Sequence, residues 1–179
     1  MHVLIAGILG GIAMYVWASV AHLSPLATIG VHTIPNEPLV SAALKLNLGD
    51  KGGVYVYPGM SAAPPKGDAP KTVAAGMLAY TPNSPAGLSP TQLGAEFGLE
   101  IVESLLLAFA LALSSGFGAR LGLAVLVGLI VGISTNFSYW NWYGFGLDYT
   151  LANAFIELVK YAVAGLVIAL MLGRRRATT

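Results

Sequence analysis

The stretch TLANAFIELVKYAVAGLVIALMLG, residues 150–173, decides the fold because it combines the length of a membrane span with two opposite charges. A helix needs about 20 mostly apolar residues to cross a bilayer. Glu157 and Lys160 are three positions apart, which places them on one side of a helix. A charge inside lipid is costly, so such residues usually face the interior of a bundle and pair there. The stretch therefore predicts a spanning helix packed against others that carry polar partners.

The composition of the whole chain favours a membrane protein. Of its 179 residues, 56% are hydrophobic and only 9% are charged, whereas soluble domains usually carry about 25% charged residues. Three other apolar runs are near spanning length, namely residues 3–21, 97–115 and 121–135 with their flanks. We therefore predict an all-α membrane protein, a four-transmembrane-helix bundle with a small extracytoplasmic α/β cap.

These runs divide the chain into three parts. Residues 1–21 form the first transmembrane helix, residues 22–95 the extracytoplasmic loop and cap, and residues 96–179 the remaining three spans with a cytoplasmic C-terminal tail. The first run resembles a signal peptide, because Ser19-Val20-Ala21 has the pattern of a cleavage site. No Lys or Arg precedes the run, so we expect it to be retained as a helix.

The basic residues predict the orientation of the spans. Arg120 lies in the link between the second and third spans, and the arginines 174–176 follow the fourth span. The link between the third and fourth spans contains neither Lys nor Arg. Cytoplasmic links carry an excess of these residues. Both termini are therefore expected in the cytoplasm, with the long loop on the opposite side.

The long loop contains local signals for three short elements. Asn36, followed by Glu37 and Pro38, is a typical helix start. The segments GVYVY, residues 53–57, and GMLAY, residues 76–80, have the residue types of strands. Ser89-Pro90-Thr91-Gln92 has the pattern of a capping box and predicts that the second long helix begins near residue 90.

The segment SYWNWYGFGLDYT, residues 138–150, is predicted to link the third and fourth spans at the outer face. Trp and Tyr favour the membrane–water interface, because their rings are apolar and their N–H and O–H groups are polar. Gly144 and Gly146 permit a turn, and Asp148 or Thr150 can cap the next helix. An aromatic ligand site is the alternative. The predicted interfacial belt consists of Tyr139, Trp140, Trp142 and Tyr143.

The acidic residues of the second span predict a buried polar network. Glu96, Glu100 and Glu103 share one helix face, and Glu103 lies about 10 Å below the outer surface, at the level of Glu157. We expect Lys160 to pair with Glu157, Glu103 or both. The network can be a structural ion pair, a proton or ion relay or polar ligand site, or a docking surface for another subunit. Its predicted members are Glu100, Glu103, Glu157 and Lys160, with Asn153 and His22 as possible extensions.

Small residues at a spacing of four predict close helix contacts. Lipid is as apolar as the helix surface, so helices associate where small side chains let their backbones approach. The repeats are Gly7 and Gly11 in the first span, Gly128 and Gly132 in the third, and Gly165, Ala169 and Gly173 in the fourth.

Several phrases, in this order, resemble a group of small bacterial integral membrane proteins with four spans. They are TIPNEPLVSAAL, VYPGM, GMLAYTP, LSPTQLGAEF and YWNWYGFGLDYTLA, after a glycine-rich span with Trp17 and His22. The resemblance covers most of the chain. It implies a multi-pass protein of the bacterial cytoplasmic (inner) membrane, with its loop outside the cytoplasm. It assigns no activity and no functional residue.

The sequence predicts a protein that is not an enzyme. It has no Ser–His–Asp order, phosphate-binding loop or zinc-ligand spacing, so we predict no catalytic residue, metal or cofactor. We expect a non-catalytic accessory or structural subunit of a larger bacterial membrane complex, of respiratory or photosynthetic type. Its partners would be membrane lipid and other membrane subunits, and not nucleic acid. The alternatives are a lipid, quinone or pigment binding protein, and a small transporter or proton relay that uses Glu103, Glu157 and Lys160.

Overall fold

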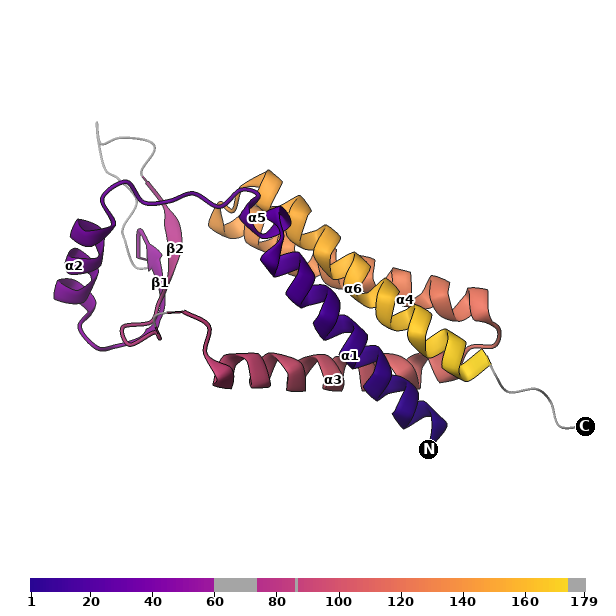
Figure 1. Cartoon of the computed structure of the whole chain (residues 1–179). Helices are drawn as coiled ribbons and strands as arrows, with labels where there is room; N and C mark the ends of the chain where they lie inside the picture. The colour runs from indigo at the N-terminus through magenta and orange to yellow at the C-terminus, as the bar shows by residue number, and fades with distance from the viewer. Residues whose placement is uncertain (60–73, 86, 174–179) are drawn as a thin grey trace, which may run out of the picture.

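The computed structural model describes residues 1–59, 74–85 and 87–173, and the chain is mainly helical (Figure 1). Within these residues, four helices are longer than 15 residues. A short helix and a two-stranded ribbon lie at one end of them. The long helices are α1 (His2–Leu23), α3 (Pro90–Ala112), α4 (Phe117–Gly132) and α6 (Leu147–Gly173).

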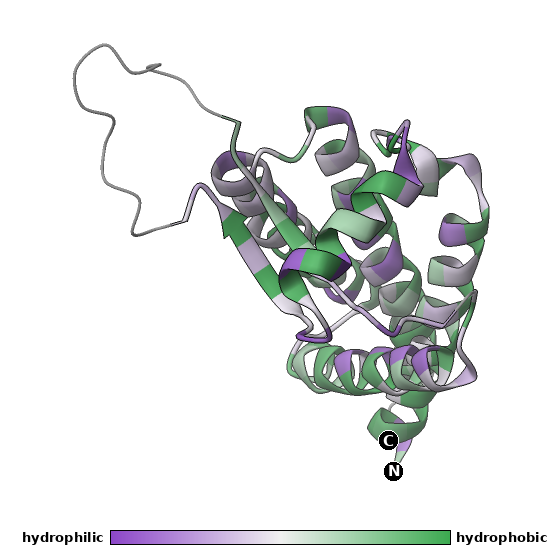
Figure 2. Ribbon diagram, turned by 90° about the vertical axis from the view of Figure 1, so that its left-hand side faces the viewer, coloured by the Kyte–Doolittle hydropathy of each residue, from purple (hydrophilic) through white to green (hydrophobic). Residues whose placement is uncertain are grey.

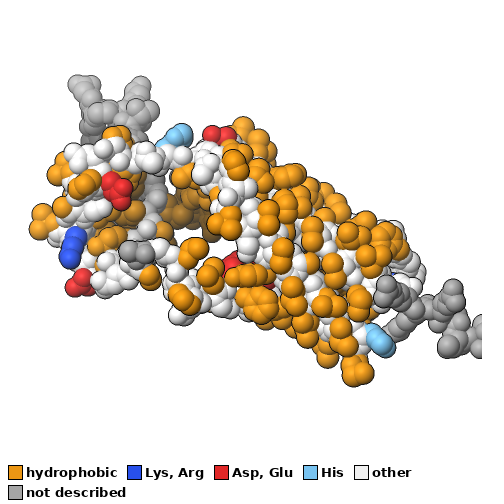
Figure 3. Space-filling view, viewed as in Figure 1, with side chains coloured by type: hydrophobic (Ala, Val, Ile, Leu, Met, Phe, Trp, Pro, Cys, Tyr) orange, Lys and Arg blue, Asp and Glu red, His pale blue; other side chains and the backbone are white. Residues whose placement is uncertain are grey.

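Three helices are long and apolar enough to cross a membrane. They are α1, the continuous helix Phe117–Tyr143 that begins with α4, and α6, with mean hydropathies of 2.0, 2.0 and 2.1. Helix α3 has 23 residues, but every stretch of 18 residues within it contains Glu96, Glu100 and Glu103. Composition and length thus support three of the four predicted spans. Apolar side chains cover most of the helical surface visible in Figure 3.

The long helices form an open bundle in which α6 is central. Helix α6 packs along α4 on one side and along α1 on the other, and α1 packs along α3. Helices α3 and α4 touch little, although a short turn connects them. At that turn, Arg120 Nε donates to the carbonyl oxygens of Leu111 and Ser114, at 3.3 and 3.2 Å. The guanidinium group thereby satisfies carbonyl groups at the C-terminal end of α3.

The glycine pairs of α1 and α4 lie at helix contacts, as predicted. A Cβ atom added at Gly7 would lie 3.0 Å from Cα of Leu105, and one at Gly11 would lie 2.8 Å from Cα of Ile101. Gly128 and Gly132 face α6 in the same way. Gly165 of α6 faces Ala124 of α4, whereas Gly173 meets no described neighbour.

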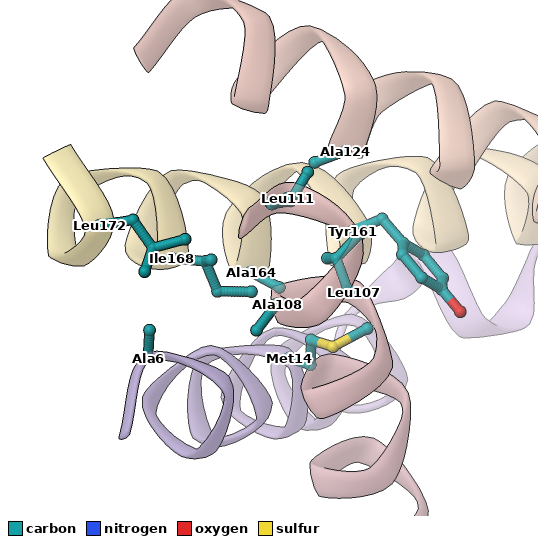
Figure 4. Close-up of a cluster of buried hydrophobic side chains, with 10 residues drawn as sticks. All are labelled: Ala6, Met14, Leu107, Ala108, Leu111, Ala124, Tyr161, Ala164, Ile168 and Leu172. Atoms are coloured by element: carbon teal, nitrogen blue, oxygen red, sulfur yellow. The ribbon is translucent and has the colours of Figure 1, made fainter. Parts of the chain in front are cut away.

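The hydrophobic core lies where α1, α3 and α6 meet, with one residue from α4 (Figure 4). Four of its ten side chains are alanines, which agrees with close packing of the helix backbones. Its buried members are Ala6, Met14, Leu107, Ala108, Leu111, Ala124, Tyr161, Ala164, Ile168 and Leu172.

The tryptophan-rich segment is helical, so the prediction of a turn over residues 138–150 is wrong for its first half. Helix α4 continues through a π-helical segment, η2 (Ile133–Phe137), into α5 (Ser138–Tyr143). The chain turns only at Gly144, whose φ of +74° suits glycine. The physical reason is that no glycine or proline interrupts the helix before that position. Helix α6 then begins at Leu147, before both Asp148 and Thr150, so neither occupies the predicted cap position.

The short elements of the loop form where they are predicted. Helix α2 (Glu37–Leu48) begins after Asn36, whose Oδ1 accepts a hydrogen bond from the Leu39 N–H at 3.3 Å. Strands β1 (Gly53–Tyr57) and β2 (Gly76–Tyr80) pair antiparallel, and a 3₁₀ turn, η1 (Pro25–Thr28), follows α1. Helix α3 begins at Pro90, but the Ser89 side chain makes no capping hydrogen bond. The view from this end shows α2 and the strands in front of the mostly hydrophobic helices (Figure 2).

Substitution of Gly11 by Leu is expected to lower the free energy of unfolding by about 1–3 kcal/mol, because the new side chain would meet the α3 backbone. Thermal unfolding in a single detergent measures this. Ile12→Leu is the matched control, because Ile12 is 41% exposed on the same helix. An unchanged unfolding temperature in Gly11→Leu would contradict the α1–α3 contact.

Candidate functional site: a buried ion cluster between helices α3 and α6

Lys160 lies at the centre of a cluster of three carboxylates. Its Nζ atom is 2.9 Å from Glu157 Oε2, 3.4 Å from Glu100 Oε1 and 3.4 Å from Glu103 Oε2. Glu157 precedes Lys160 by about one turn of α6, while Glu100 and Glu103 are three residues apart on α3. The ammonium group therefore joins the two helices, although α3 and α6 make few other contacts.

Tyr161 adds a neutral hydrogen-bond donor to the cluster. Its hydroxyl donates to Glu103 Oε2 at 3.1 Å, and Lys160 Nζ lies 5.6 Å from the centre of its ring. Figure 4 shows the ring leaving the apolar core with its hydroxyl at the outer end. A buried Tyr usually finds a hydrogen-bond partner. Its position next to Lys160 is the only signal in the sequence that could have identified it.

The three carboxylates differ in their exposure. The Glu100 side chain is 2% exposed, that of Glu157 is 27% exposed, and that of Glu103 is 40% exposed. The cluster therefore runs from a sealed end at Glu100 to an open end at Glu103.

Two buried polar atoms near the sealed end have no hydrogen-bond partner among the described residues. They are Glu100 Oε2 and the hydroxyl oxygen of Ser104, one turn further along α3. Buried polar atoms are nearly always paired, and an unpaired one costs about 1–3 kcal/mol. This end of the cluster therefore has acceptor capacity that the protein itself does not use.

The charges within the cluster do not balance. One ammonium group faces three carboxyl groups, so the cluster holds two more acidic groups than basic ones. Water screens charges poorly at a site of this burial, so Coulomb interactions there are stronger than in bulk solvent. The cluster thus favours an additional positive charge, carried by a proton or by a cationic group.

Trp17 links α1 to α6 next to the ion cluster, and this contact was not predicted from the sequence. Its indole N–H donates to the carbonyl oxygen of Ile156, the residue before Glu157, at 3.0 Å. Nothing in the spacing of Trp17 indicates this partner, because the two residues are 139 positions apart. The bond fixes the position of α1 beside the cluster.

The structure does not bring Asn153 and His22 to the cluster, in contrast to their predicted role as extensions. The side-chain amide of Asn153 donates to the carbonyl oxygen of Tyr149 on its own helix, at 2.9 Å. Asn153 precedes Lys160 by seven residues, or about 10 Å along α6. His22 is exposed at the end of α1 and, with Glu96, lines a separate cavity of about 200 Å³.

A second cavity opens beside the exposed end of the cluster. It has a volume of about 250 Å³ and lies between α3, α4 and α6. Glu103 and Tyr161 form its polar end, and the remaining walls are apolar. We call this cavity the Glu103 groove, and its lining residues are Glu103, Leu106, Leu107, Ala110, Val127 and Tyr161.

The residues of the predicted aromatic belt all lie on α5. The rings of Tyr139 and Phe145 stack with their centres 5.4 Å apart. Trp142 and Tyr143 also line a cavity of about 230 Å³ that the β-ribbon closes on its other side. All four belt residues are exposed, to 41% for Tyr139, 44% for Trp140, 74% for Trp142 and 38% for Tyr143.

Removal of the central charge is expected to destabilise the protein. Lys160→Met should lower the free energy of unfolding by about 3–5 kcal/mol, because it leaves three carboxylates without a counter-charge. Thermal unfolding in detergent measures this loss. Adding Glu100→Gln should restore part of it, while Glu96→Gln, at an exposed residue of the same helix, should restore none. Equal stability of Lys160→Met and the parent would show that the cluster does not hold the helices together.

Among the described residues, no group of His, Cys, Asp and Glu side chains is suited to hold a metal ion. No protein-family model, curated protein sequence or solved structure matches this chain. The resemblance to small bacterial membrane proteins stays a prediction.

Proposed function

We propose that this protein is a non-catalytic accessory subunit of a larger bacterial membrane complex. The observation that carries the proposal is two pairs of glycines that have no neighbour among the described residues. An added Cβ atom at Gly94 or Gly98 on α3, or at Gly118 or Gly122 on α4, would meet none of these residues within 4 Å. The sequence analysis missed both pairs, because they lie at the ends of the apolar runs.

The other glycine pairs of the chain indicate the role of the free pairs on α3 and α4. Helix α3 packs against Gly7 and Gly11, and helix α6 packs against Gly128 and Gly132, each at close backbone distance. The same four-residue spacing in membrane helices favours contact with another helix. The free pairs are therefore suited to helices that this chain does not supply.

Helix α4 offers the larger free surface. In an apolar stretch of the helix Phe117–Tyr143, only 17% of the residues are buried, against 33% for α1 and 44% for α6. Gly118 and Gly122 lie on its uncovered side, together with Leu126 and Leu129. A partner helix that packs on this side would bury a face that is exposed in the isolated chain.

The ion cluster has a structural role in this proposal. Lys160 can reach Glu100 and Glu103 only when α3 presents that face to α6. The cluster therefore fixes the rotation of α3 and, with it, the direction in which Gly94 and Gly98 point. Such a charge cluster is tolerated within a membrane when its members pair with one another.

The same contact supports a fourth transmembrane span. Helix α3 packs along α1, which is long and apolar enough to cross, and its Glu100 is sealed against Lys160 of α6. In the proposed topology, Arg120 is cytoplasmic, and α2 with the β-ribbon forms an extracytoplasmic cap. The arginines 174–176, which also support this orientation, lie outside the described residues.

Labelling of single engineered cysteines tests the topology, and the chain offers a clean background because it contains no cysteine. Asn47→Cys on α2 should react with a membrane-impermeant maleimide added to intact cells from which the outer membrane has been removed. Ser115→Cys, between α3 and α4, should react only after the membrane is permeabilised. Reaction of both residues from one side would contradict four spans.

Enlarging the free glycines tests the role as a subunit. The double variant Gly118→Leu, Gly122→Leu should lose co-purifying membrane proteins in mild detergent, because leucine side chains prevent close approach of a partner helix. Native mass measurement and identification of the bound chains provide the readout. The double variant Val16→Phe, Val20→Phe is the control, because it adds bulk at the same four-residue spacing on α1, where Val16 is 56% and Val20 is 55% exposed.

Two results would contradict the proposal. One is that native mass measurement gives the parent protein the mass of a single chain. The other is that the double variant retains the same partners as the parent. The unfolding temperature of the double variant should match that of the parent, since neither glycine has a neighbour in the part of the chain that the structure describes.

A further inference from the structure

We propose that the Glu103 groove binds a small amphiphile with a cationic head and an apolar body. The groove lies between α3, α4 and α6 and ends at the ion cluster. This inference goes beyond a role in assembly, because it concerns a ligand site on the isolated chain.

The lining of the groove indicates a ligand with an apolar body. Four of its lining residues are Leu106, Leu107, Ala110 and Val127, and its volume is about 250 Å³. Ligand cavities commonly measure about 300–1,000 Å³. A small molecule that fills this groove would therefore leave part of its body exposed to lipid. The loose contact between α3 and α4 leaves the groove open on that side.

The polar end of the groove offers an acceptor to an incoming head group. Glu103 Oε2 already accepts from Lys160 and Tyr161, yet 40% of the Glu103 side chain remains exposed. The carboxylate therefore keeps acceptor sites on the side of the groove. The Tyr161 hydroxyl is engaged with Glu103, so the head group meets an acceptor and not a free donor.

The charge of the cluster selects a cation over a neutral or anionic head. Three carboxyl groups surround the single ammonium group, so the acidic groups of the cluster are in excess. Glu103 is the most exposed of the three and lines the groove, and the buried Glu100 behind it has an Oε2 atom without a partner among the described residues. A second positive charge at Glu103 would reduce this excess at short range. An anionic head, such as a sulfate or phosphate, would increase it.

A binding experiment with matched head groups tests this site. The protein is placed in phosphatidylcholine nanodiscs, and equilibrium dialysis measures uptake of radiolabelled octylammonium, with empty nanodiscs as the background. Octyl glucoside and octyl sulfate carry the same alkyl chain with a neutral and an anionic head. We expect saturable binding of the ammonium compound at one site per chain, and no saturable binding of the other two.

Variants of the groove locate the site. Glu103→Gln should weaken binding about tenfold, because it removes the charge at the polar end, and Ala110→Phe should abolish binding by filling the apolar part. Glu96→Gln removes a carboxylate from α3 outside the groove and should bind like the parent. The thermal unfolding of each variant shows whether it is folded.

The proposal would be overturned by equal binding by Glu103→Gln and the parent, by equal saturable binding of octyl sulfate, or by unchanged binding by a folded Ala110→Phe. A loss of binding in Glu96→Gln as large as that in Glu103→Gln would also contradict the proposal. The cation would then be attracted by the charge of the whole acidic face of α3 and not by the groove. None of these outcomes bears on the free glycine pairs of α3 and α4.

Discussion

The attraction between Lys160 and its three carboxylates is the constraint on which the arrangement of the helices depends. An ammonium group that is 8% exposed, in a helix long enough to span a membrane, is tolerated only when its partners are close. Glu157 is on the same helix and pairs with it in any arrangement. Glu100 and Glu103 are on α3, so they pair with Lys160 only if α3 lies beside α6 in one rotation. Apolar contacts alone would leave that rotation open, because lipid solvates any apolar face equally well.

Local sequence signals predicted the parts of the fold that depend on nearest neighbours in the chain. The Asn36 cap, the β-rich segments 53–57 and 76–80, and the helix start at Pro90 each rest on a few adjacent residues. The pairing of Lys160 with Glu157 and Glu103 follows in the same way from their spacing and from the cost of a charge in lipid. The predicted turn at 138–150 was wrong for its first half, because the preference of Trp and Tyr for an interface says nothing about backbone conformation.

Apart from the Lys160–Glu103 pair, features that depend on contacts distant in the sequence were not predictable from it. The bond from Trp17 to the carbonyl of Ile156 requires the crossing of α1 and α6 to be known. The Glu103 groove exists because α3 and α4, although consecutive, diverge and pack on different partners. The free glycine pairs cannot be told from the occupied ones by spacing alone, because Gly118 and Gly122 repeat the pattern of Gly128 and Gly132. Only the packed structure shows which pair has a neighbour.

The π-helical segment Ile133–Phe137 has a consequence for how this protein can change over evolution. A π turn accommodates one residue more than an α turn, and here Asn136 Nδ2 bonds back to the carbonyl of Gly132. Loss of a single residue there would convert the segment to regular α-helix and rotate α5 by about 100° relative to α4. The side chains of α5, Trp140 and Trp142 among them, would thus change direction without repacking Gly128 or Gly132 against α6. The direction of the aromatic side chains around the helix axis therefore does not depend on how α4 packs against α6.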